Sequence, residues 1–292
     1  MGGGAENETP GNYATVSGGA GNWASGNYAT VSGGAGNTAS GPGAFVGGGG
    51  YDGYTHSGNT ASGAAATISG GLSNQATNNF ATVGGGSSNT AGGADATIPG
   101  GSGNVARGQG SFVAGVNATD VFNGTNCNNS FVWGDSSRQS VSQGANTFNV
   151  LATGGFWIFS GPYPAGVKLP ANSSAWVSIC DRNVKKDFAP VDGRAVLEKL
   201  AAMPIQQWHY QWEKDTDTLN IGPMAQDFKA AFYPGRDDKG ISTLEFDGVE
   251  LAAIQGLNQK LENETKAKDA EIQDLKQSVA ELKAMVEKLA GK

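Results

Sequence analysis

The sequence predicts a mostly β chain: a β-solenoid, then a β-rich connector, then an α+β region that ends in a long coiled-coil helix. Three observations predict this fold class. A 15-residue repeat fills the first third of the 292-residue chain, short apolar runs between Gly and Asn turns follow it, and an aliphatic heptad closes it. Each is a hydrophobic periodicity, which is the primary sequence signal of secondary structure.

The repeat is defined by three columns of residues that keep one register. The aliphatic column consists of Val16, Val31, Val46, Ile68, Val83, Ile98 and Val113. The other two columns are Asn22, Asn37, Asn59, Asn74, Asn89 and Asn104, and Ala24, Ala39, Ala61, Ala76, Ala91 and Ala106. Such agreement predicts stacked coils, each with two short strands, in which Gly and Asn supply the turns. Because the inward residues are small, we expect the coils to stack on one another and to pack against other chains.

One step of the repeat is seven residues longer than the others and falls around Tyr51-Asp52-Gly53-Tyr54-Thr55-His56. The register holds on both sides, so we expect a loop that bulges from one coil. Aromatic residues leave the repeat here, which makes the loop a candidate contact for a cell-surface receptor or glycan. A neutral insertion is the alternative.

The repeats resemble a known family over about residues 11–116. Their alternation of Ala-Thr-Val/Ile-x-Gly-Gly with Asn-x-Ala-x-Gly is similar to that of the left-handed parallel β-roll heads of trimeric autotransporter adhesins. The resemblance implies a homotrimer in which the aliphatic column faces the three-fold axis.

Composition and charge exclude several classes of function. The net charge is −7, and of the 19 Lys and Arg residues only Arg107 lies in the first 116 residues, which argues against a nucleic-acid partner. Cys127 and Cys180 have no metal-ligand spacing, and we expect neither a metal nor a cofactor. No 18-residue apolar run and no signal peptide are found in the chain as given, so no membrane insertion is expected.

Residues 117–179 are predicted to form a β-rich stalk or connector. Its short apolar or alternating runs are Ser130–Trp133, Thr147–Leu151, Phe156–Phe159 and Trp176–Ile179. Short strands with so thin a core suggest packing between chains.

The chain changes character at Cys180, and residues 180–246 are predicted to form a separate domain. Asp192 is expected to cap a helix that stops before Pro204. A strand is expected over 205–212, where Trp208, Tyr210 and Trp212 alternate with polar residues as core or trimer-interface side chains. Residues 221–228 are expected to form a strand, a turn and a helix with Pro223 at its first position.

Residues 247–292 are predicted to form a trimeric coiled coil. Nine of its twelve a and d positions are aliphatic, and the full set is Leu251, Ile254, Asn258, Leu261, Thr265, Lys268, Ile272, Leu275, Val279, Leu282, Val286 and Leu289. A buried Asn258 would fix the register. A single solvated helix is the weaker alternative.

The order of motifs after residue 179 resembles a second family. Cys180-Asp181-Arg182-Asn183-Val184-Lys185-Lys186-Asp187-Phe188, then Ile221-Gly222-Pro223-Met224-Ala225-Gln226, then a terminal helix are similar to the C-terminal intramolecular chaperone domain of phage tailspikes, tail fibres and endosialidases. That family carries Ser-Asp-x-x-x-Lys, then Ile-Gly-x-x-Ala-Gln. The resemblance implies that the domain trimerises the chain, assists folding of the β part, and cuts itself off before the Ser with a Ser/Lys dyad.

Here Cys180 stands at the Ser position, and Lys185 matches the family's base. A thiol is the better nucleophile near neutral pH, although a sulfur in a site shaped for oxygen could also abolish cleavage. The lysine must be neutral to accept a proton, and burial favours that form. Asp181 and Asn183 could orient the site or serve only as turn and cap residues.

Two functions remain open from the sequence. The first is a trimeric structural fibre, on a virion tail or a bacterial cell surface, whose partners are two further copies of itself and a receptor or glycan. The second is a single-turnover peptidase that cuts its own chain between Ile179 and Cys180. The expected domains are 1–116, 117–179, 180–246 and 247–292.

Overall fold

A computed structural model describes residues 2–51, 53, 57–233 and 237–291 of the chain. The chain divides into two compact units, Met1–Val177 and Ser178–Lys292. Each unit is described by itself below.

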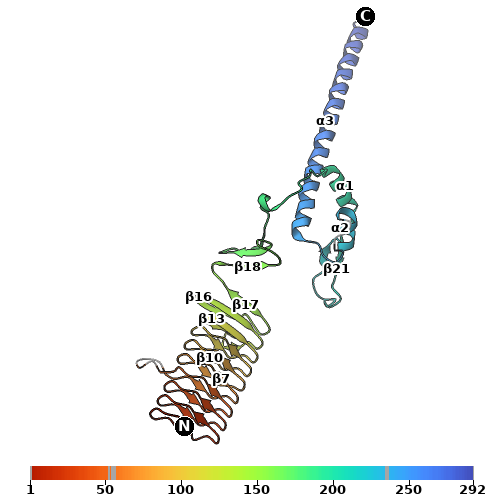
Figure 1. Cartoon of the computed structure of the whole chain (residues 1–292). Helices are drawn as coiled ribbons and strands as arrows, with labels where there is room; N and C mark the ends of the chain where they lie inside the picture. Colours follow the sequence, from red (N-terminus) through yellow and green to blue (C-terminus); the bar gives the residue numbers. More distant parts are fainter. Residues whose placement is uncertain (1, 52, 54–56, 234–236, 292) are drawn as a thin grey trace. The chain divides into compact units, whose positions relative to one another are not determined.

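The first unit is built on a parallel β-solenoid (Figure 1). Its coils contribute short strands to two stacks. One stack consists of β1 (Thr15–Val16), β3 (Thr30–Val31), β5 (Phe45–Val46), β7 (Thr67–Ile68), β9 (Thr82–Val83) and β11 (Thr97–Ile98). The other consists of β2 (Trp23–Ala24), β4 (Thr38–Ala39), β6 (Thr60–Ala61), β8 (Gln75–Ala76), β10 (Thr90–Ala91) and β12 (Val105–Ala106). The longer β13 (Phe112–Thr119) pairs with both β11 and β12 and so joins the stacks.

The predicted register is confirmed across the insertion. Val46 pairs with Ile68 and Ala39 with Ala61, so the longer coil leaves the ladders on both sides unbroken. Tyr51 of this loop is exposed, and its backbone N–H donates to the Ala35 carbonyl oxygen. Asp52 and Tyr54–His56 lie outside the described residues, so the proposed receptor contact stays a prediction.

The aliphatic column lies inside the solenoid. Its seven members are 0% exposed in the single chain, where they pack with the buried alanines of the same coils. The expectation that this column faces a three-fold axis is therefore wrong. Side chains alternate between the two faces of a strand, and here the preceding residue, such as Thr30 or Phe45, takes the outer face while the aliphatic residue fills its own coil.

The Asn column forms a buried hydrogen-bonded ladder. Asn37 donates to Oδ1 of Asn22 from its backbone N–H (3.0 Å) and its side-chain amide (3.2 Å). The same amide donates to the Gly33 and Gly49 carbonyl oxygens at 3.0 and 2.9 Å. The six Asn are at most 1% exposed. Their expected role as positive-φ turn residues is thus wrong: those φ values fall on residues such as Gly34 (82°) and Tyr28 (61°), while the Asn pairs groups that stacking would otherwise bury unpaired.

The parallel sheet continues beyond residue 116. The strand β16 (Phe131–Val141) pairs with β13, and β17 (Phe148–Leu151) pairs with β16. The rings of Phe112, Phe131 and Phe148 stack in one column, with centroids 5.2 and 4.4 Å apart. Two smaller sheets complete the unit: the hairpin β14 (Val121–Phe122) and β15 (Thr125–Asn126), and the sheet of β18 (Gly155–Phe159), β19 (Gly166–Pro170) and β20 (Val177–Ser178).

The second unit contains a small α+β core and a long helix. Its elements are the 3-10 helix η1 (Arg182–Val184), α1 (Gly193–Ala202), β21 (Gln206–Trp208), β22 (Asn220–Gly222), α2 (Ala225–Phe232) and α3 (Thr243–Ala290). Met203, Phe228 and Val249 form the buried centre of this core.

The local predictions for this unit are mostly correct. Asp192 caps α1 by accepting from the backbone N–H groups of Arg194 and Ala195. The strand expected over 205–212 ends at Trp208. Beyond it the Tyr210 ring packs edge-on against Trp208 and stacks on Trp212, with ring centroids 4.6 and 4.5 Å apart. Pro223 precedes α2, whose N-cap is Met224, so it does not occupy the first helical position.

Candidate functional site

The segment that follows β20 brings the predicted site residues together within one short turn. Asp181 is the N-cap of η1, and its Oδ1 accepts from the backbone N–H (2.9 Å) and the side-chain amide (3.0 Å) of Asn183. The backbone N–H of Lys185 donates to the Arg182 carbonyl oxygen at 3.2 Å. Asp181 and Asn183 therefore shape the turn that joins Cys180 to Lys185.

The central contact of the site joins Cys180 and Lys185. The Lys185 ammonium donates to the Cys180 sulfur, with Nζ and Sγ 2.9 Å apart. Asp181 and Asn183 hydrogen-bond to each other, and among the described residues neither side chain hydrogen-bonds to the sulfur or the ammonium. Both residues therefore serve as turn and cap residues. They orient Cys180 and Lys185 only by fixing the backbone of the turn between them.

The site is open to water in the single chain. Cys180, Asp181, Asn183 and Lys185 are all exposed, while Ile179 is half-buried. The thiolate is the nucleophilic form of cysteine. General-base action by the same lysine needs its neutral form, and nothing in the described part of this chain removes water from it.

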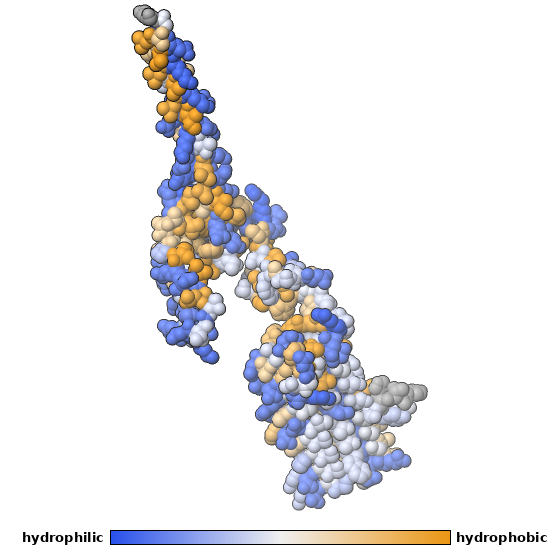
Figure 2. Space-filling model, turned by 180° about the vertical axis from the view of Figure 1, so that it is seen from behind, coloured by the Kyte–Doolittle hydropathy of each residue, from blue (hydrophilic) through white to orange (hydrophobic). Residues whose placement is uncertain are grey.

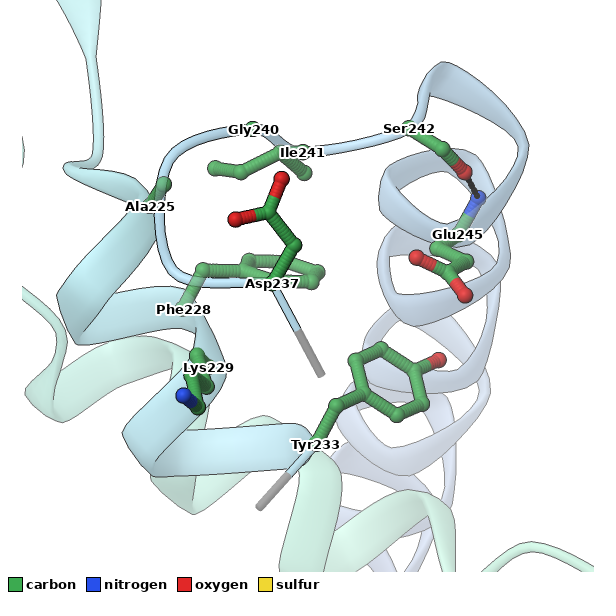
Figure 3. A pocket seen from close by; sticks show the side chains of 9 residues that line it. All are labelled: Ala225, Phe228, Lys229, Tyr233, Asp237, Gly240, Ile241, Ser242 and Glu245. Carbon is green, nitrogen blue, oxygen red and sulfur yellow. Dashed lines mark hydrogen bonds between the residues drawn. The ribbon is translucent and has the colours of Figure 1, made fainter. Parts of the chain in front are cut away.

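The second unit also carries an open pocket of about 430 Å³ between the end of α2 and the start of α3 (Figure 3). Phe228 and Ile241 supply its apolar surface, and Lys229, Asp237 and Glu245 supply charge. The Ser242 hydroxyl accepts from the Glu245 backbone N–H at 3.2 Å and caps α3 at the pocket's edge (Figure 3). Cys180 and Lys185 do not line this pocket.

No metal or membrane site emerges from the described residues. Within ranges 2–51, 53, 57–233 and 237–291 no group of three or more His, Cys, Asp or Glu side chains could hold a metal ion. No helix in the described part of the chain is both long enough and apolar enough to cross a bilayer.

The long helix α3 presents an apolar seam. Leu251 and Ile254 are 64% and 63% exposed, and the aliphatic a and d residues from Leu261 to Leu289 are exposed as well. Figure 2 shows hydrophobic residues gathered along one side of this helix. By contrast, Val249, Ala253 and Gly256 are buried against the core of the same unit. In the first turns of α3 one face is thus buried against the core and the opposite face is exposed.

Comparison with known proteins finds a family match over the turn at Cys180 and most of the core that follows it. Residues 180–235 match the chaperone of endosialidase family. The match begins at Cys180 and covers η1, α1, the β21–β22 hairpin and α2, and it confirms the C-terminal intramolecular chaperone domain expected from the motifs. A comparison with curated proteins finds no match to this chain. Residues 180–235 are called the chaperone segment below.

Sequence reasoning missed two carboxylates that hold the first unit together. Asp120 is fully buried and accepts from the backbone N–H groups of Arg107 (2.7 Å) and Gly108 (2.6 Å). The Asp135 carboxylate accepts from the backbone N–H and hydroxyl groups of Ser137 in β16 and of Thr153 in the turn after β17. These four hydrogen bonds are called the Asp135 clasp below. An isolated Asp next to Thr119 or Ser136 was the available signal, but it does not distinguish a carboxylate that joins two segments from one in an exposed turn.

Proposed function

We propose that the protein is a homotrimeric fibre in which the chaperone segment and α3 assemble the β-solenoid that precedes them. The observation that carries the proposal is the exposed aliphatic seam of α3 directly after a chaperone of endosialidase segment. In water, a seam of this length on a lone helix leaves a large apolar surface exposed. Helices with such a seam commonly bury it by packing against copies of themselves in a coiled coil.

The small sheet before the chaperone segment supports the same proposal. Trp157, Ile158 and Phe159 of β18 and Trp176 beside β20 are each about half exposed. A three-stranded sheet cannot cover aromatic residues on both of its faces. Neighbouring copies would cover them, so this sheet is a second place where three chains meet.

The solenoid depends less on packing against other chains than the sequence suggested. Its aliphatic and Asn columns are buried inside one chain, so the coils have a core of their own. The chaperone segment therefore acts mainly on register: it holds three copies together while the coils form in the right order. A solenoid whose repeats are alike can start on the wrong coil, because each coil contacts only its neighbours.

The proposed setting is a phage tail or another extracellular fibre. The chaperone of endosialidase match supports this setting, and the solenoid would be the part that meets a receptor or glycan. Trimerisation is tested by light scattering on the full chain at micromolar concentration. A monomer at that concentration contradicts the proposal.

Self-cleavage is the second candidate, and the 2.9 Å contact between Cys180 and Lys185 favours it. The Cys180 sulfur attacks the carbonyl carbon of Ile179, a C–S bond forms, the C–N bond to Cys180 breaks, and the freed amine takes up a proton. Water then hydrolyses the thioester to an Ile179 carboxylate and restores the thiol. The bond lies two residues after the boundary between the two compact units, so its cleavage would separate them.

Intact mass after denaturation tests the cleavage. The candidate requires one fragment that ends at Ile179 and one that starts at Cys180, with Lys185→Ala abolishing both. Lys186→Ala is the matched control, since it removes an adjacent exposed charge and leaves the contact with sulfur in place. A single intact chain of 29.7 kDa contradicts self-cleavage and leaves the trimeric fibre untouched.

A further inference from the structure

The seam of α3 is interrupted midway by polar residues. Counting from Leu251 as an a position, Asn258 and Thr265 occupy a positions and Lys268 occupies a d position. All three are exposed in the single chain. Lys268 forms no ion pair within the described residues, whereas Lys260, on another face, lies 4.0 Å from Glu264. A lysine in an apolar seam is costly unless an acid meets it when the seam closes.

Coiled-coil geometry supplies that acid from a second copy of the chain. In parallel, in-register helices, a d side chain inserts into a hole made by four residues of the facing helix. For Lys268 these are the neighbouring copy's Thr265, Lys268, Asp269 and Ile272. Asp269 occupies the e position that borders the hole, so each ammonium meets one carboxylate and the layer is neutral.

The charges beside the seam favour the same arrangement. In a parallel coiled coil, each g residue faces the following e residue of its neighbour. Glu271 is at g and Lys276 at the following e, so these two are opposite in sign across the interface. Glu264 at g and the neighbour's Asp269 at e are both acidic, and Lys268 lies beside them as the compensating charge. The charge pattern therefore fits a second copy of this chain, aligned in parallel and in register.

A shifted partner loses this complementarity. If one helix slips by a heptad, Lys268 faces the neighbour's Ile272, Leu275, Lys276 and Val279. That hole holds no acid and adds a like charge, so this ammonium would be desolvated without a partner. The other helix's Lys268 then faces Asn258, Leu261, Glu262 and Thr265 and keeps one acid, so the slip leaves one of the two ammonium groups unpaired.

We propose that Lys268 and Asp269 form an interchain layer that selects the parallel, in-register pairing of α3, an inference that rests on the proposed trimer. The layer costs some stability compared with an all-aliphatic seam, and it disfavours helices that are shifted by a heptad. Through α3 it would set the axial register of the three chains before the solenoid coils form.

Charge exchange in the full chain tests the layer. Lys268→Asp and Asp269→Lys each place charges of one sign in the layer, so each is expected to lower the thermal midpoint of the helical circular dichroism signal. Each should also raise the concentration at which trimers dissociate by at least about tenfold. The double variant Lys268→Asp with Asp269→Lys restores opposite charges, and its midpoint and trimer should recover. The matched control is Lys266→Asp, a similar charge change at a b position away from the seam.

The outcomes separate the two proposals. If the single variants behave like Lys266→Asp, or the double variant is no better than either single, the layer is overturned while the trimer stands. If the unaltered chain is not a trimer, the proposed function itself fails.

Discussion

Gly193 at the start of α1 and Gly256 in α3 lie in backbone contact where the two helices cross. A Cβ on Gly193 would lie 2.8 Å from the Ala252 carbonyl oxygen and 3.0 Å from the Gly256 nitrogen, and a Cβ on Gly256 would overlap the Gly193 carbonyl. Both glycines are buried. The crossing anchors the seam-bearing helix to the chaperone segment, and it explains a Gly in the interior of α3 despite its low helix propensity.

Gly256→Ala is therefore expected to destabilise the second unit, because its methyl group meets backbone rather than a movable side chain. Overpacking of this kind costs about 1–3 kcal/mol, against a gain of about 1 kcal/mol in helix propensity. Gly248→Ala is the control, since its Cβ would meet nothing within 4 Å in the same helix. Urea unfolding followed by circular dichroism should show a lower midpoint for Gly256→Ala and an unchanged or higher one for Gly248→Ala. Equal midpoints for the two variants would contradict the close crossing.

Asn74→Ala is expected to weaken the solenoid more than most single substitutions. The Asn74 amide donates to the Gly70 (3.0 Å) and Gly86 (2.9 Å) carbonyl oxygens, and its Oδ1 accepts two bonds from Asn89. Leaving such buried groups unpaired costs about 1–3 kcal/mol each. Thermal unfolding of the full chain should show a clearly lower midpoint for the first unit. Asn12→Ala, at an exposed position, should leave it unchanged, and a similar small effect of both variants would show that the ladder adds little.

The Asp135 clasp predicts a stability that depends on pH. The side-chain hydroxyls of Ser137 and Thr153, with their backbone N–H groups, hold the pKa of Asp135 far below its ordinary value of 3.8. Because the folded pKa is the lower one, the clasp stabilises the fold above pH 3.8 and loses this contribution as the pH falls toward the folded pKa. The urea midpoint should thus fall more steeply from pH 5 to pH 2 in the native chain than in Asp135→Asn. Asp95→Asn, at another exposed carboxylate, should keep the native slope; a native slope in Asp135→Asn would refute the clasp.

Shortening α3 separates its two contacts. Removal of residues 258–292 keeps Val249, Ala253 and Gly256 against the core, so the chaperone segment is expected to stay folded while trimers dissociate at a higher protein concentration than those of the full chain. Removal of 243–292 takes those buried residues away and should unfold the segment as well. Circular dichroism and light scattering on both chains distinguish these results. Trimers of undiminished stability after the shorter deletion would show that the seam is dispensable.

Local and periodic features of this fold were predictable from sequence, and distant contacts were not. The repeat gave the strand register because each coil pairs with a copy of itself 15 residues away, and Asp192 marked α1 because capping is local. The inward direction of Val31 and the ladder through Asn37 were missed. A period does not tell whether a column faces its own coil or another chain. The crossing of Gly193 and Gly256 was also hidden, since 63 residues separate the two positions in the chain.

The candidate site was likewise predictable in its local features and not in its surroundings. The resemblance to the chaperone family implied that Cys180 and Lys185 act together, and a single turn capped by Asp181 brings the sulfur and the ammonium to 2.9 Å. Their exposure to water could not be predicted, because it depends on what packs around the turn.

The mass of the full chain in solution tests the central proposal most directly. Light scattering coupled to size exclusion, at micromolar protein concentration, is expected to give three times the chain mass of 29.7 kDa, and native mass spectrometry should give the same stoichiometry. A single species at 29.7 kDa would contradict the account of the chain as a trimeric fibre assembled through its chaperone segment and α3.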